Sequence, residues 1–287
     1  MTTNKQSPVP GRPTIEAMRT PFGAVVRGLR LGEIDSEIAD ALHRRLNEHQ
    51  LLVIHPADPG ACALPVLCRH FGQVMAHGFG LPLGETGGYH SPTTWRADLT
   101  HLPNPPTVGM ARYDGVAGAL PMPTVWASLS AAHEGLGPHW RERLGRLDAI
   151  HSSRGAHDTR ADVADPTVTH PLVRALDTHR RCGLFFNTRH VRRVGDLSDD
   201  VSRAFAVFLS AHIARASLRL DWQPGTVLIW DNRAVVRQLD RAAHAPNVEW
   251  CVGAPRPVID PSTAAHARIG LALDAGRSSA SSHCERD

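Results

Sequence analysis

The stretch that decides the fold class is WQPGTVLIWDNRAVVRQ, residues 222 to 238. Its Pro-Gly pair at 224 and 225 is typical of a turn, and the apolar run that follows is typical of a buried strand. Similar short strands are indicated at 23–31 (GAVVRGLRL), 51–55 (LLVIH), 183–187 (GLFFN) and 248–257 (VEWCVGAPRP). Helical stretches stand before and between them without regular β–α–β alternation. The pattern predicts an α+β fold with a β-sandwich or barrel core.

Two segments have the apolar period of amphipathic helices. In residues 36–49, Ile38, Leu42 and Leu46 recur every four residues, and Ser36 is the expected N-cap. Residues 197–214 show a second apolar face. Weaker helix signals follow at 64–74 (LPVLCRHFGQV) and after TVWAS, where Ser128 or Ser130 would cap the helix.

The remaining organisation is simple. We expect a loose N-terminal arm over residues 1–20, one domain over 21–262, and a disordered tail over 263–287, where periodicity is lost. No signal peptide and no apolar run long enough to cross a membrane is evident, so we expect a cytoplasmic protein without a membrane partner. The sequence leaves homo-oligomer formation open.

Composition argues against a nucleic-acid-binding, a zinc-binding or a disulfide-rich protein. Of 31 basic residues only Lys5 is lysine, a bias that indicates a GC-rich bacterial genome more than a nucleic-acid partner. With a net charge of +3 and nine Phe and Tyr residues in total, base-stacking platforms are not expected. Five scattered cysteines without a Cys-x-x-Cys pair support neither a zinc knuckle nor a disulfide framework.

Seven segments in order resemble the taurine dioxygenase-like (TauD/TfdA) family of Fe(II)/2-oxoglutarate-dependent oxygenases. They are LNEHQLLVIH, RHFGQV, TTWRADLTHLPNPP, PTVWASLSAAHEGL, THPLVR, GLFFNTRHVRRVGDLS and WQPGTVLIWDNRAVVRQ. The resemblance as a whole covers roughly residues 22 to 258. The resemblance implies a double-stranded β-helix (jelly-roll) core with flanking helices, as in clavaminate synthase and TauD, and this agrees with the α+β prediction.

The resemblance also implies an iron site, built from a His-x-Asp pair and a distant histidine. Those positions fall on Arg96, Asp98 and Arg237, so only the carboxylate is kept. A guanidinium has no lone pair to offer and stays protonated, so neither arginine is an ordinary iron ligand. The sequence therefore predicts no metal at these residues.

The implied 2-oxoglutarate site differs as well. The family's assisting threonine falls on Thr124, but its anchoring arginine falls in a strand whose nearest charged residue is Glu249. A carboxylate there would repel 2-oxoglutarate. From these substitutions we predict that the chain uses neither family cofactor.

Three interpretations of the arginines remain open. They could neutralise the buried Asp98 as a structural plug in a scaffold protein without activity. They could bind an anionic small molecule, with Asp98, Arg96 and Arg237 as catalytic groups of a metal-independent, biosynthetic enzyme and His90, His101 and His190 beside the ligand. Finally, displaced histidines could complete a metal site for a dioxygenase, although strand alternation would turn His101 away from Asp98. We favour the second.

Overall fold

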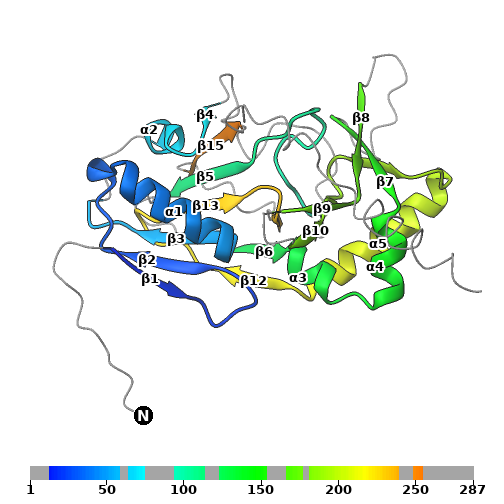
Figure 1. The fold of residues 1–287 in the computed structure, drawn as a ribbon, viewed down its shortest axis with the longest axis horizontal. Helices are drawn as coiled ribbons and strands as arrows, with labels where there is room; N and C mark the ends of the chain where they lie inside the picture. The colour runs from blue at the N-terminus through cyan, green and yellow to red at the C-terminus, as the bar shows by residue number, and fades with distance from the viewer. Residues whose placement is uncertain are drawn as a thin grey trace, which may run out of the picture.

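The computed structural model describes residues 13–58, 64–74, 94–113, 123–153, 166–176, 181–238 and 248–254. Its centre is formed by two antiparallel-rich sheets (Figure 1). The larger sheet runs β1 (Thr14–Ala17), β2 (Ala24–Arg27), β3 (Leu51–His55), β13 (Val227–Asp231), β5 (Val108–Tyr113), β15 (Val248–Ala254) and β4 (Gln73–Val74). The smaller runs β12 (Ser217–Leu220), β6 (Thr124–Ser128) and β14 (Val235–Gln238).

Strand β13 shows how the layers form. Val227 and Ile229 face helix α1 (Ser36–His49) in one apolar cluster, whereas Leu228 and Trp230 face the smaller sheet in another. This alternation follows from the two-residue period of a strand, and both faces of β13 are buried. The stretch that predicted a strand therefore lies at the centre of the fold.

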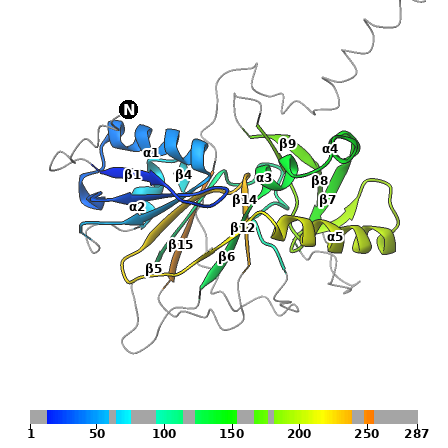
Figure 2. The same ribbon diagram turned by 90° about the horizontal axis from the view of Figure 1, so that it is seen from below.

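Most of the described elements from residue 129 to residue 214 form a second layer beside these sheets (Figure 2). It holds two small sheets and three helices, packed around their own apolar cluster. These elements are α3 (Leu129–Glu134), α4 (Pro138–Gly145), β7 (Asp148–Ser152), β8 (Thr167–Pro171), β9 (Val173–Ala175), β10 (Cys182–Leu184), β11 (Val191–Val194) and α5 (Asp199–Ala214). A 3-10 turn (Leu31–Glu33) and helix α2 (Leu64–Arg69) complete the described elements.

The helix predictions are confirmed, with small corrections. Helix α1 has the predicted bounds, but its N-cap is Asp35, whose carboxylate accepts the Ile38 amide at 2.8 Å. Ser128 caps α3 as predicted. The segment 64–74 is helical only to Arg69 and then enters β4.

The predicted loose arm also needs correction. Residues 14 to 17 form strand β1, which pairs with β2 because Ile15 packs against the cluster under α1. Residues 1–12 and the predicted tail lie outside the described residues. Within the described ranges, no helix has the length and apolar character needed to cross a membrane.

Candidate functional site

Strand β14 positions the first arginine. Val236 faces the cluster of the second layer, whereas Val235 and Arg237 face the tryptophans between the two sheets. The Arg237 guanidinium lies 4.9 Å from the Trp230 ring centroid and 5.8 Å from that of Trp126, within cation–π range. Only 6% of Arg237 is exposed.

A carboxylate neutralises this buried cation. Arg237 donates through Nη1 to Asp98 Oδ2 at 2.9 Å and through Nη2 to Oδ1 at 2.6 Å. This is the bidentate fork that guanidinium and carboxylate form best. Asp98 and Arg237, two of the positions that the family resemblance aligns with an iron site, thus meet across 139 residues of sequence.

Arg96 belongs to the same cluster through its backbone. Its amide donates to the Arg237 carbonyl at 2.8 Å, and the Arg237 amide donates back at 2.9 Å. Burial, together with the nearby charges of Arg189 and Arg237, lowers the pKa of the Arg96 side chain to about 10, while Asp98 opposes the shift. The charges of Arg189, Arg237 and Asp98 therefore all act on the Arg96 guanidinium.

Asn232, which the sequence analysis overlooked, holds the Asp98 backbone. Its side-chain oxygen accepts the Asp98 amide at 2.7 Å, and its nitrogen donates to the carbonyls of Asp98 at 2.8 Å and Pro106 at 3.0 Å. This clamp fixes a turn in which Leu99 takes a positive φ of 55°. No local signal marked Asn232, because its partners lie more than 120 residues away.

The turn after β13, which carries Asn232, also contains an ion pair. Arg233 donates through Nε and Nη2 to the Asp231 carboxylate at 2.9 and 2.6 Å, and its amide donates to Oδ1 at 2.9 Å. Asp231 is buried at the end of β13. These two residues hold the turn that precedes β14 and Arg237.

Histidines gather beside Asp98. The rings of His101 and His190 are 4.8 Å apart. Burial, together with the nearby charges of His101 and Arg189, lowers the pKa of His190 to about 3. The expectation that strand alternation turns His101 away was wrong, because residues 98–102 form turns and not a strand. Asp98 and His101 both act on His190.

A second histidine group lies deeper. Asn187 donates to the Thr100 hydroxyl oxygen at 2.8 Å, and Nδ1 of His151 lies 3.0 Å from the same oxygen. His170 contacts the Thr100 carbonyl at 3.0 Å. This network holds the residues just after Asp98 in place.

Thr124 is linked to the arginine cluster through tryptophan side chains. Its hydroxyl oxygen accepts the indole N–H of Trp126 at 2.8 Å and that of Trp222 at 3.0 Å. Trp126 in turn is the register partner of Arg237. Thr124 therefore hydrogen-bonds the tryptophans that pack beside the arginine cluster. That Thr124 contacts a ligand stays a prediction.

The strand carrying Glu249 has a cation opposite it. In the register of β15 and β5, Glu249 pairs with Arg112. The side chain of Glu249 lies outside the described residues, as does the whole of His90. The prediction that this strand repels 2-oxoglutarate considered the charge of Glu249 alone and omitted that of Arg112.

Comparison with known proteins decides the family. The sequence model described as "Taurine catabolism dioxygenase TauD, TfdA family" matches residues 14–236. The chain belongs to the TauD/TfdA family. The AAD-2 crystal structure in complex with Mn(II) and N-oxalylglycine superimposes with a TM-score of 0.69 at 21% identity, over 85% of this chain and 98% of that one. The predicted double-stranded β-helix core is confirmed by this likeness.

Curated relatives give the family's chemistry. The alpha-ketoglutarate-dependent dioxygenase cnsP of Penicillium expansum is 25% identical over 74% of this chain and 66% of its own length, just under two thirds. The alpha-ketoglutarate-dependent sulfate ester dioxygenase of Pseudomonas putida is 27% identical over 74% of this chain and 79% of its own.

These relatives correct one prediction. The expectation that this TauD/TfdA chain uses no cofactor was wrong, because its family and relatives are alpha-ketoglutarate-dependent dioxygenases, whose cofactors are iron(II) and 2-oxoglutarate. The physical error was to treat two lost imidazoles as the loss of both cofactors. Alpha-ketoglutarate is a dianion, and guanidinium groups are well suited to bind its carboxylates.

The residues fit the two cofactors differently. The guanidiniums grouped at Arg96 suit the carboxylates of 2-oxoglutarate. Iron(II) does not fit the positions of Arg96, Asp98 and Arg237, because guanidinium nitrogens cannot coordinate it and both Asp98 oxygens accept from Arg237. In the part of the chain that the structure describes, no other group of three or more His, Cys, Asp or Glu residues forms a metal site.

Proposed function

We propose that this TauD/TfdA protein binds an anionic small molecule at the cluster of Arg96, Asp98 and Arg237. The observation that carries the proposal is the grouping of guanidiniums: Arg189 and Arg237 both act on the charge of Arg96, and Arg237 is bound to Asp98. A bound anion would interact favourably with these guanidiniums in a partly buried place, where charge interactions are weakly screened.

The three residues have different parts in this proposal. Arg237 is held by Asp98 and the tryptophans, so Asp98 anchors the site and does not face the ligand as a free base. Arg96 is half-buried and extends from the same backbone bridge, so it is the group that meets the anion. Two classes of anion are supported by the relatives' names: 2-oxoglutarate and sulfate esters.

Calorimetric titration tests the proposal. We expect 2-oxoglutarate and hexyl sulfate to bind, whereas neutral hexanol, with the same carbon chain as the sulfate, does not. Arg96→Gln should weaken anion binding about tenfold or more, because a charge-assisted hydrogen bond is lost. Arg193→Gln, at an exposed arginine of β11, is the matched control and should leave the affinity unchanged.

Each titration is run anaerobically with and without Fe(II). Anion binding without iron supports direct capture by the guanidiniums, whereas binding that requires Fe(II) contradicts it. The proposal also fails if neither anion binds, or if Arg96→Gln and Arg193→Gln behave alike.

A further inference from the structure

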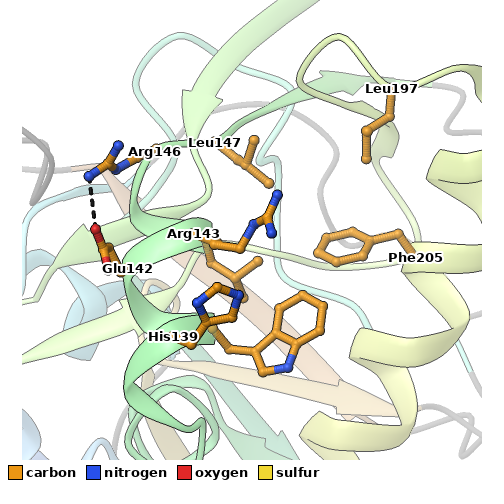
Figure 3. A pocket seen from close by; sticks show the side chains of 9 residues that line it. His139, Glu142, Arg143, Arg146, Leu147, Leu197 and Phe205 are labelled. Atoms are coloured by element: carbon orange, nitrogen blue, oxygen red, sulfur yellow. Dashed lines mark hydrogen bonds and ion pairs between the residues drawn. The ribbon is translucent and has the colours of Figure 1, made fainter.

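Helix α4 presents apolar side chains and an arginine to the same groove. Trp140, Leu144 and Leu147 recur at steps of four and three, so they share one face of the helix and of the residues just after it. Arg143 lies three residues after Trp140 and projects into the groove (Figure 3). The sequence of α4 therefore places a guanidinium within an apolar surface.

The groove has a volume of about 710 Å³, which is in the range of sites that hold a small organic molecule. Leu197 and Phe205 lie across it from Arg143 (Figure 3). Leu147, Leu197 and Phe205 also pack against the core of the second layer, where Leu144 is completely buried. The apolar walls of the groove are therefore held in place by this core.

Part of the aromatic surface at the groove is in contact with water. Trp140 is 42% exposed, although its ring packs against that of Phe208 with the centroids 5.2 Å apart. Phe208 in turn stacks on Phe205, with the centroids 6.1 Å apart. An apolar ligand that covered these rings would remove their exposed area from water, which is favourable.

The charges at the groove indicate what kind of ligand it fits. Arg146 donates to Glu142 at 2.9 Å, so these two side chains neutralise each other (Figure 3). In the part of the chain that the structure describes, Arg143 forms no ion pair with a carboxylate. A guanidinium without a counter-charge, set among apolar side chains, is complementary to a molecule with an anionic head and an apolar body.

We propose that this groove binds a single amphiphilic carboxylate, such as a medium-chain fatty acid. The carboxylate accepts hydrogen bonds from the Arg143 guanidinium, and the hydrocarbon chain lies between Trp140 of α4 and Phe205 of α5. The site is distinct from the cluster at Arg96, because its lining residues come from α4, α5 and the residues that follow α4 and precede α5.

Calorimetric titration of the full chain with sodium decanoate, dispersed below its micelle concentration, tests this proposal. We expect decanoate to bind, whereas decanol, which lacks the charge, and butyrate, which lacks most of the hydrocarbon, should bind at least about tenfold more weakly. Arg143→Gln should weaken decanoate binding about tenfold or more, because a charge-assisted hydrogen bond is lost. Arg141→Gln is the matched control, since Arg141 is an exposed arginine of the same helix that does not line the groove.

A second pair of variants tests the apolar wall. Trp140→Ala should weaken decanoate binding about tenfold or more, because the hydrocarbon chain loses one of the two rings that it packs against. Val66→Ala, at a side chain of α2 that is 45% exposed, should leave the affinity unchanged. Thermal unfolding without ligand shows that each variant is folded before it is titrated.

The proposal is overturned if decanoate does not bind, or if either variant behaves like its control. It is also overturned if the chain binds only vesicles of phosphatidylglycerol, which would make this face a contact with a lipid surface. Loss of decanoate binding in Arg96→Gln, with full binding in Arg143→Gln, would assign the anion to the arginine cluster instead. Failure of 2-oxoglutarate or hexyl sulfate to bind at Arg96 leaves the groove proposal standing.

Discussion

The fork between Asp98 and Arg237 is the most consequential single interaction in the molecule. The Arg237 side chain is 7% exposed and that of Asp98 is 20% exposed, so removing either charge leaves the other with little water. We expect Asp98→Asn to lower the free energy of unfolding by about 3 kcal/mol, because it leaves a buried guanidinium without its counter-charge. Urea denaturation measures this loss.

A matched ion pair serves as control. Asp221 and Arg219 form an ion pair at the surface, where their side chains are 82% and 69% exposed and such a pair contributes about 0 to 1 kcal/mol. Asp221→Asn should therefore cost far less than Asp98→Asn. Equal losses would show that the fork is not a buried pair in solution.

His151 makes stability depend on pH. Its ring is completely buried, and burial lowers its pKa well below the ordinary value, with His170 and His190 adding to the shift. Below about pH 6.5 the unfolded chain takes up a proton that the folded site resists, so stability falls as the pH falls. His151→Asn should flatten this fall, as measured by urea unfolding between pH 7 and pH 5.

Substitution of an exposed histidine is the comparison for this experiment. His139→Gln on α4 should leave the slope with pH as in the wild type, because its ring is in water in both states. A His151→Asn variant with the wild-type slope would contradict the assignment.

At the scale of elements, the pairing of strands β5 and β13 in the larger sheet supports the arginine cluster. Gly109 is the register partner of Trp230, and a Cβ added there would lie 2.2 Å from the indole ring. Gly109→Ala must therefore displace Trp230, over which Arg237 lies. We expect a loss of stability of about 1 to 3 kcal/mol and weaker anion binding. Gly137→Ala meets open space and should change neither, and a stable, ligand-binding Gly109→Ala protein would argue against the packing.

At the scale of the whole molecule, the cluster joins two apolar cores. Trp95 and Val236 belong to the core of the second layer, whereas Trp126 and Trp230 belong to the core between the sheets. An anion bound only to the folded protein at 100 times its dissociation constant should add about 2.7 kcal/mol to the free energy of unfolding. Thermal unfolding followed by tryptophan fluorescence and by far-ultraviolet dichroism should then shift equally, and separate shifts would mean that the ligand stabilises one layer alone.

The amino-acid sequence by itself determined the helices at 36–49 and 197–214 and the central strand before Asp231, because amphipathic period and turn residues act over a few positions. By resemblance it also aligned Arg96, Asp98 and Arg237. Only the tertiary structure decided which groups act on one another. The charge of Arg189 acts on Arg96, Arg112 is the register partner of Glu249, and Asn232 accepts the Asp98 amide. The strands β7 to β9 and β11 were missed for the same reason. Each depends on partners far along the chain, and a polar or weakly apolar residue carries no local signal of the neighbour that folding brings to it.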